Sequence, residues 1–168
     1  MQNMIAGLIW SIPIQSSSYI IVLLVISACS GGGSKISPPP EIPEVNAPAE
    51  IDELNIYQAS REAMRRAVAG LDIKPDYLLV DARSVPGIRV EQLAIKSGDA
   101  KSQSIAAASI LAKVHRDDLM QEYAKEYPGY GFENHAGYPT KVHVEALKRL
   151  GPTPIHRQSF GPVRDCLL

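Results

Sequence analysis

The sequence predicts an α/β domain over residues 46–168, preceded by a segment of different composition over residues 1–45. Three observations predict this class. Apolar residues recur at helical spacing over residues 52–70 and again over 102–127, and between them the apolar run Tyr77–Val80 has the length and flanks of a buried strand. Helices that alternate with a buried strand cover the faces of a sheet, which is the arrangement of α/β and α+β domains.

The N-terminal segment is apolar and carries no charged residue before Lys35. Its apolar run ends at Cys29 and precedes a Gly/Ser tether, which is the pattern of a bacterial lipoprotein signal. A spurious upstream reading frame and a fusion scar are the two alternatives. Prolines over residues 37–48 block helix formation and indicate an extended linker. We expect an irregular apolar extension on a cytoplasmic protein, with membrane anchoring through Cys29 as the alternative.

Bulk composition limits the classes of function. The net charge of −1 over 168 residues excludes a broad basic surface, so a nucleic-acid partner has to be held by local groups. Two cysteines are too few for a disulfide framework, and their spacing fits no zinc site.

The first half of the predicted domain contains one helix and two strands. The helix is predicted to run without a break from Asp52 until Gly70 ends it. The buried strand then ends in Asp81, and its unbroken apolar run predicts layers on both faces of the sheet. A second, weaker strand candidate precedes Gly98.

The long helix over residues 102–127 carries acids close to its apolar side. At about 100° per residue, Asp117 and Asp118 lean toward that side, while Lys113 and Arg116 point elsewhere. An ionised carboxylate on a buried face costs several kcal/mol, so we expect a cation or a donor to compensate. The side chains predicted to form the apolar side are Ile110, Leu111 and Val114.

A Gly/aromatic stretch and a shorter helix complete the domain. The aromatic rings of residues 127–140 either stack on a sugar or base or form a packed turn. Residues 141–150 are predicted to form a helix closed by Gly151. The four histidines fit no two-histidine zinc spacing, so each is predicted to be an ordinary hydrogen-bonding residue of a surface or loop. They are His115, His135, His143 and His156.

The acids offer a candidate metal site. Asp81 follows the buried strand, where the functional groups of open sheets gather. A strand-end aspartate and a helix-face aspartate together form the smallest oxygen set for a hard divalent cation. Two alternatives stay open. Asp81 caps a local turn, or the helix acids, Asp117 and Asp118, pack against a neighbouring arginine.

Four stretches resemble a known family: "EIDELNIYQASREAMRRAV", "DYLLVDA", "GDAKSQSIAAASILAKVHRD" and "YPGYGFENHAGYPTKVHVEALKRLGPTPIHRQSF". In this order and spacing, over residues 48–164, they resemble the central and C-terminal parts of bacterial ribonuclease HII. The resemblance implies an incomplete RNase H-like fold with a reduced sheet flanked by helices. It also implies an endonuclease that uses Mg²⁺ or Mn²⁺ to cut the RNA strand of RNA–DNA hybrids and duplex DNA with embedded ribonucleotides.

The resemblance also implies roles for individual residues. Asp81 and Asp117 match catalytic metal ligands, whereas Asp118 falls on a variable position. Tyr138 matches a tyrosine that packs on the sugar at the RNA–DNA junction, and Ala136 stands where a lysine is frequent. Three polar residues at the start of the long helix are expected to face substrate phosphate. They are Lys101, Ser102 and Ser104.

One motif of the family has no counterpart in this sequence. Ribonuclease HII begins with a strand bearing a "DEAGRG"-like motif, and no acidic residue precedes Glu41 here. We therefore expect half of the metal-binding acids to be absent, an exposed edge on strand Tyr77–Val80, low stability and no stable protein partner. A truncated or frameshifted gene product fits this pattern. The alternatives are a non-catalytic hybrid-binding remnant and a lipid-anchored envelope protein attached through Cys29.

Overall fold

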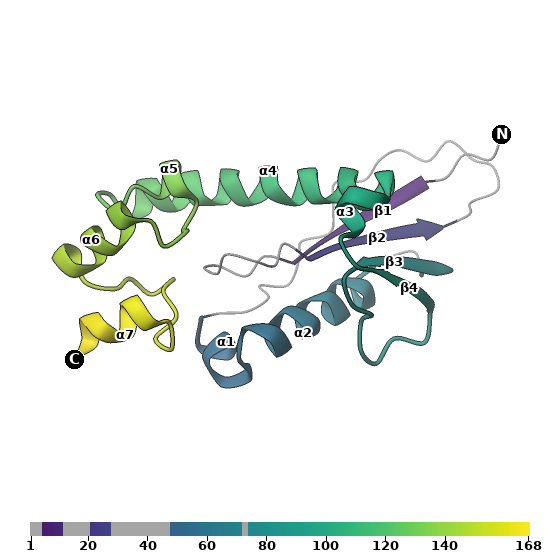
Figure 1. The fold of residues 1–168 in the computed structure, drawn as a ribbon, viewed down its shortest axis with the longest axis horizontal. Helices are drawn as coiled ribbons and strands as arrows, with labels where there is room; N and C mark the ends of the chain where they lie inside the picture. The colour runs from purple at the N-terminus through teal and green to yellow at the C-terminus, as the bar shows by residue number, and fades with distance from the viewer. Residues whose placement is uncertain (1–4, 12–20, 28–47, 72–73) are drawn as a thin grey trace. The chain divides into compact units, whose positions relative to one another are not determined.

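The computed structural model describes residues 5–11, 21–27, 48–71 and 74–168, with side chains from residue 48 onward (Figure 1). Cys29 and the proline-rich linker lie outside the described residues. The elements in chain order are β1 (Ile5–Ser11), β2 (Ile21–Ser27), α1 (Pro48–Leu54), α2 (Ile56–Ala69), β3 (Tyr77–Asp81), β4 (Glu91–Ile95), α3 (Gly98–Lys101), α4 (Gln103–Glu126), α5 (Phe132–His135), α6 (Lys141–Leu150) and α7 (Gly161–Leu167). Within the described ranges, no helix combines the length and apolar composition needed to cross a bilayer.

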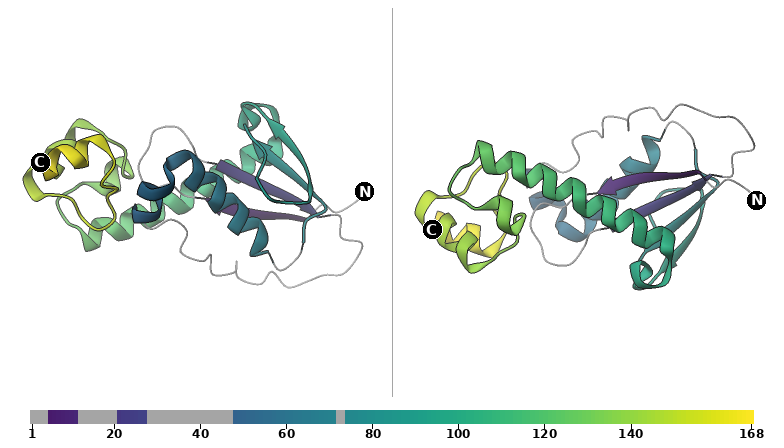
Figure 2. Two further views of the ribbon diagram at one scale, coloured as in Figure 1. Left: turned by 90° about the horizontal axis from the view of Figure 1, so that it is seen from below. Right: turned by 90° about the horizontal axis from the view of Figure 1, so that it is seen from above.

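The chain forms two compact units, and each is described by itself. The first contains the strands, α3, and the adjoining parts of α2 and α4. The second contains α1, the start of α2, and the chain from Ala112 to the C-terminus. Two helices, α2 and α4, therefore contribute to both units, and Figure 2 shows α4 as one continuous helix.

The sheet of the first unit has four strands in the order β1-β2-β3-β4. Strand β2 pairs antiparallel with β1 on one side and with β3 on the other, and β4 pairs parallel with β3. The expectation of an irregular N-terminal extension was wrong for these two segments, and so was the expectation of an exposed β3 edge. Unpaired N–H and C=O groups along a buried strand are costly, and apolar, β-branched segments such as β2 are suited to pair with them.

The core of the first unit forms where α2 packs on β3. Leu78 and Val80 are completely buried, whereas the alternate residues of β3 are half-buried. In Figure 1, the parts of α2 and α4 in this unit lie on opposite sides of the sheet, which confirms the predicted flanking helices. The residues that pack around Leu78 and Val80 are Met64, Ala67, Val68 and Val85.

Asn55 divides the predicted first helix into α1 and α2, so the expectation of one continuous helix was wrong. Its backbone has φ 63°, a left-handed conformation that asparagine tolerates better than most residues. Its side-chain Oδ1 accepts hydrogen bonds from the N–H groups of Tyr57 at 3.1 Å and Gln58 at 3.2 Å. One residue therefore ends α1 and caps α2.

The buried side of α4 is not the predicted one. Ile110, Leu111 and Val114 are 64%, 44% and 52% exposed. The N-terminal half of α4 carries apolar residues on all sides, so helical periodicity alone did not identify the face that packs. Small residues allow close packing of the side that is buried. That side consists of Ile105, Ala108, Ala112, Arg116 and Met120.

The second unit packs around Phe132, which is fully buried in the short helix α5. The Gly/aromatic stretch is therefore a packed turn in part, one of the two alternatives expected. Helix α6 follows with the predicted bounds, capped by Thr140 and ended by Gly151 at φ 80°. The other buried residues of this core are Met120, Tyr130, Ala146, Leu147, Ile155 and Val163.

Asp52 joins α1 to the C-terminal part of the second unit. Its carboxylate accepts hydrogen bonds from the N–H groups of Gln158 at 2.8 Å and Ser159 at 3.2 Å, and from the Ser159 hydroxyl. Although partial burial raises the pKa of Asp52, these hydrogen bonds lower it below the ordinary value. The helix α1 is thus attached through ionised Asp52 to a segment more than 100 residues later in the chain.

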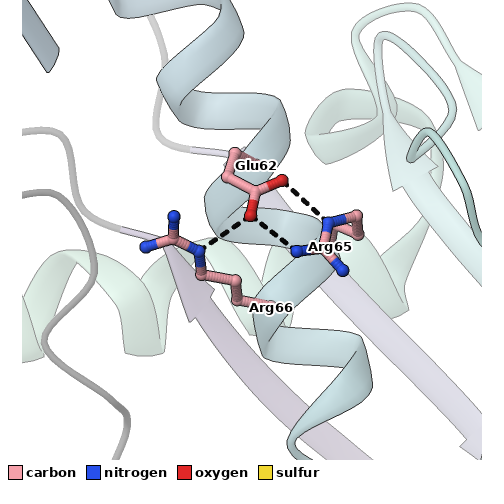
Figure 3. Close-up of polar contacts among 3 residues, drawn as sticks. All are labelled: Glu62, Arg65 and Arg66. Carbon is pink, nitrogen blue, oxygen red and sulfur yellow. Dashed lines mark hydrogen bonds and ion pairs between the residues drawn. The ribbon is translucent and has the colours of Figure 1, made fainter. Parts of the chain in front are cut away.

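On the first unit's part of α2, Glu62 accepts hydrogen bonds from Arg65 at 2.6 and 2.7 Å and from Arg66 at 2.8 Å (Figure 3). The Arg65 hydrogen bond is the main cause that lowers the pKa of Glu62 to about 2. Arg65 and Arg66 each lie about one helical turn from Glu62 on a partly exposed surface, so each ion pair stabilises the helix by less than about 1 kcal/mol.

Replacement of the helix joint tests this fold description. We expect Asn55→Ala to lower the free energy of unfolding by about 1–2 kcal/mol, because alanine removes the cap of α2 and disfavours a positive φ. Urea denaturation measures this change as a lower midpoint at unchanged m. Asn55→Asp is the matched control, since it keeps the acceptor oxygen. Equal losses in the two variants would contradict the capping role.

Candidate functional site

Asp81 is the last residue of β3 and is held from the adjoining turn. Its Oδ1 accepts a hydrogen bond from the N–H of Gly98, the first residue of α3, at 2.7 Å. Asp81 pairs with Ile95 in the ladder, and the next residue, Ala82, has a left-handed φ of 64° that turns the chain away. The alternative that Asp81 caps a local turn is therefore confirmed for its Oδ1 atom. Among the described residues, Oδ2 of Asp81 has no hydrogen-bond partner.

Gly98 lets the helix approach the strand end closely. A Cβ at this position would lie 2.7 Å from Cδ1 of Ile105 and 3.2 Å from Oδ1 of Asp81. Both distances are shorter than ordinary van der Waals contact, so a side chain here displaces the buried Ile105 side chain or the Asp81 carboxylate. The sequence predicted Gly98 only as the residue that ends the second strand candidate. The signal for its positioning role was a glycine next to an acid directly after a strand.

The three predicted phosphate-facing residues lie where α3 ends and α4 begins. Ser102 accepts a hydrogen bond from the Ile105 N–H through its Oγ at 3.4 Å, and its own N–H donates to Gly98 O at 2.8 Å. Lys101 Nζ donates to Lys96 O at 2.8 Å. Ser104 is half-buried. The main chain of Gly98 is therefore hydrogen-bonded to both Ser102 and Asp81. The contact of these three residues with substrate phosphate stays a prediction.

Asp117 lies on the second unit's part of α4 and forms an ion pair with Lys113, with 2.5 Å between Oδ2 and Nζ. The predicted compensating cation is thus present, although Lys113 was expected to point elsewhere. The side chains of Lys113 and Asp117 are 63% and 41% exposed, and Asp118 is exposed, so the predicted burial was wrong for both acids. A pair this exposed is weak and can be exchanged.

Arg116 connects α4 to the loop that carries Tyr138. Its guanidinium carbon lies 4.4 Å from the centre of the Tyr138 ring, and its Nη2 donates to Ala136 O at 2.6 Å. Arg116 is 5% exposed, so the expectation that it points away from the buried side was wrong. The sequence signal was an arginine directly before a candidate metal ligand. Its position places Tyr138 beside the turn of α4 that also carries Asp117.

Three histidines form a buried cluster around Phe132, so the prediction of surface or loop residues was wrong for His135 and His143, which lie in helices, whereas His156 lies in a loop but is buried. The rings of His135 and His143 stack with centroids 4.6 Å apart, and Nε2 of His143 lies 3.1 Å from Nε2 of His156. Burial lowers the pKa of His143, and burial together with the neighbouring His143 lowers the pKa of His156 to about 4. The cluster draws on α5, α6 and the loop before α7, and spacing along the chain does not reveal such a meeting.

The site residues divide between the two units. Asp81, Lys101, Ser102 and Ser104 belong to the first, while Asp117 and Tyr138 belong to the second. A metal site shared by Asp81 and Asp117 therefore stays a prediction. Across the ranges that the structure describes, no group of three or more His, Cys, Asp or Glu side chains is placed to hold a metal ion.

A family model for ribonuclease HII matches residues 41–163, which include both acids and Tyr138. This chain belongs to the ribonuclease HII family. The match confirms the resemblance of the four stretches and, with it, the α/β class. Enzymes of this family depend on divalent metal ions.

Individual members of the ribonuclease HII family support the assignment. Ribonuclease HII of Lactobacillus helveticus is 59% identical over 121 residues, which cover 72% of this chain and 48% of the relative. Ribonuclease HII of Bacillus licheniformis is 61% identical over 115 residues, which cover 68% and 45%. The crystal structure of ribonuclease H2 from Pyrococcus horikoshii matches with a TM-score of 0.57 and 28% identity, over 71% of this chain and 64% of that one. The chain spans about half the length of the curated relatives it matches.

Substitution of Gly98 tests the close approach of helix and strand. We expect Gly98→Ala to lower the free energy of unfolding by about 1–3 kcal/mol, because the methyl group overlaps Ile105 and Asp81. Gly161→Ala is the matched control, since no heavy atom lies within 4 Å of a Cβ there. Urea denaturation compares the two variants. A loss as large for Gly161→Ala as for Gly98→Ala would contradict the steric explanation.

The buried histidines predict a pH dependence of stability. The His156 pKa is about 4 in the folded chain against 6.5 for an unperturbed histidine, so the unfolded chain binds the extra proton between these values. Its stabilising contribution is complete above about pH 6.5 and is lost toward pH 4, by at most about 3 kcal/mol. Urea denaturation across this range measures the loss. The loss becomes smaller in His156→Gln and is unchanged in His115→Gln, which replaces an exposed histidine; equal slopes in all three proteins would refute the assignment.

Proposed function

We propose that this chain carries the metal-binding and substrate-binding residues of a ribonuclease HII-type endonuclease. Its substrates are the RNA strand of RNA–DNA hybrids and single ribonucleotides embedded in duplex DNA. Asp81 and Asp117 hold divalent ions, Tyr138 packs on the substrate sugar, and the start of α4 faces phosphate. The observation that carries the proposal is Asp81, fixed at the strand end through Oδ1 with Oδ2 left over, inside a stretch that matches the family.

The donors available fit Mg²⁺ or Mn²⁺. Both ions prefer oxygen ligands, and Mg²⁺ retains several waters when few carboxylates bind it. Asp81 offers Oδ2, and the exposed carboxylate of Asp117 is held by an exposed lysine. A surface ion pair is worth at most about 1 kcal/mol, so a divalent ion replaces Lys113 at little cost.

The mechanism follows from what the chain's residues hold in place. When bound, divalent ions supply the activation of a water and the stabilisation of the leaving 3′ oxygen. Gly98 orients the Asp81 carboxylate through its N–H. Ser102 directly precedes the 24-residue helix α4 and accepts from the N–H of Ile105, and the N-terminal N–H groups of such a helix favour a phosphate. Tyr138, fixed by Arg116, offers a ring to the ribose, and the 2′-OH of that ribose distinguishes RNA from DNA.

Cleavage of a duplex with one embedded ribonucleotide tests the proposal. We expect cleavage that requires Mg²⁺ or Mn²⁺ and that falls at least about 100-fold in Asp81→Asn and Asp117→Asn, because the amide is a poorer metal ligand. Gel electrophoresis of the end-labelled strand measures the rate. Asp118→Asn is the matched control on the neighbouring position and leaves the rate unchanged.

A second measurement separates catalysis from binding. Fluorescence anisotropy with labelled hybrid and with DNA duplex of the same sequence reports whether the chain prefers hybrid, and the preference should weaken in Tyr138→Ala. Preference for hybrid without cleavage would replace the catalytic proposal with the hybrid-binding alternative. Equal affinity for hybrid and DNA, together with no cleavage, would overturn both.

A further inference from the structure

The main chain of Tyr138 is held at both ends. Its N–H donates to His135 O at 2.8 Å, and its carbonyl accepts from the Thr140 N–H at 2.8 Å and from Nδ1 of His143 at 2.9 Å. The two residues before it, Ala136 and Gly137, have φ of 45° and 78°. A loop with two consecutive left-handed residues needs its surroundings to fix it, because alanine alone disfavours that conformation.

The bond to the Tyr138 carbonyl is the end of a buried chain of hydrogen bonds. The Thr153 N–H donates to Nδ1 of His156 at 3.0 Å, and His156 and His143 meet through their Nε2 atoms. A backbone N–H only donates and a carbonyl only accepts. His156 therefore carries its proton on Nε2 and donates a hydrogen bond to Nε2 of His143. His143 in turn carries its proton on Nδ1 and donates to the Tyr138 carbonyl.

Burial makes this chain of bonds difficult to replace. His143 is 1% exposed and His156 is 3% exposed, and the edge of Phe132 closes over His143 with centroids 5.4 Å apart. Water does not reach these nitrogen atoms easily, so loss of one partner leaves a buried polar group unsatisfied. The direction of the bonds also requires both rings to be neutral, in agreement with their lowered pKa values.

The ring and the main chain of Tyr138 are held separately. Arg116 contacts the ring from α4, whereas His143 reaches the carbonyl from the first turn of α6. Loss of the hydrogen bond from His143 to the Tyr138 carbonyl thus allows the loop to shift, while the contact of Arg116 and the packing around Phe132 stay in place. His143 is joined directly to the main chain of the residue that bears the substrate-facing ring.

We propose that His143, oriented by His156, is a positioning residue that sets where the Tyr138 ring meets the sugar of the substrate. This proposal rests on the function proposed above, because it assigns the ring of Tyr138 to the substrate. His143 does not touch the substrate itself. It acts through the carbonyl of Tyr138, and His156 acts through His143.

Variants that imitate single nitrogen atoms of histidine test the proposal in the full chain. His143→Asn places an amide N–H near the position of Nδ1 and retains the donor to Tyr138 O. His143→Phe retains the aromatic volume and has no donor. His156→Gln retains an N–H near the position of Nε2 and keeps His143 oriented, whereas His156→Phe does not.

Hybrid binding provides the first readout, by fluorescence anisotropy with a labelled RNA–DNA hybrid. We expect His143→Phe to weaken binding by about fivefold to tenfold, and His143→Asn to restore most of the loss. In a Tyr138→Ala background, His143→Phe should have no further effect, because the two residues act as a unit. Affinity for plain DNA duplex serves as the reference for each variant. Equal effects of His143→Phe with and without Tyr138 would overturn the proposal.

NMR of the free protein provides a readout that does not depend on the substrate. The Tyr138 ring shifts the signals of the Arg116 guanidinium, and this ring-current shift should decrease in His143→Phe and persist in His143→Asn. Unchanged shifts in a folded His143→Phe would overturn the positioning role even if hybrid binding fails for other reasons. Changed shifts in His143→Phe, with no effect of Tyr138→Ala on hybrid binding, would mean that His143 positions Tyr138 but that Tyr138 does not contact the substrate. That result would reject the proposed substrate contact alone. If His143→Phe does not fold, His156→Phe against His156→Gln gives the same comparison.

Discussion

The hydrogen bond from the Gly98 N–H to the Asp81 carboxylate joins the end of the buried strand β3 to the start of α3 and α4. The close approach fits a residue without a side chain, since Ile105 and Asp81 fill the space that a Cβ at position 98 needs. The same residue accepts the N–H of Ser102, the cap of α4. The orientation of the candidate metal ligand and the position of the helix N-terminus therefore depend on one close approach.

The second unit uses buried polar groups for a similar purpose. Arg116 and His143 hold the ring and the carbonyl of Tyr138 from two different helices, with few exposed atoms of their own. Buried histidine nitrogens are costly when they lack partners, and this requirement selects one tautomer at each ring of the His156–His143 pair. The exposed ion pair of Asp117 differs, because water screens it and a ligand can displace its lysine. In this unit, buried groups thus hold Tyr138, and the exchangeable carboxylate of Asp117 is exposed to solvent.

The sheet illustrates how tertiary pairing overrides an expectation drawn from family resemblance. The resemblance covers the chain from residue 48, so β3 was expected to lack its usual neighbours. Instead β2 pairs with β3 over Leu23–Ile26, a stretch outside the family match. Backbone hydrogen bonding depends little on which side chains a strand carries, so an apolar segment of suitable length satisfies the edge.

The sequence by itself determined the α/β class, strand β3 with its terminal Asp81, helix α6 with its caps, and the membership of the ribonuclease HII family. Local periodicity and motif spacing are sufficient for these because each lies in one continuous stretch. Only the tertiary structure decided which face of α4 is buried, that Asn55 breaks the first helix, and that three histidines meet. Those outcomes depend on packing between distant segments, where the small residues of α4 and the buried polar groups find partners that spacing along the chain does not reveal.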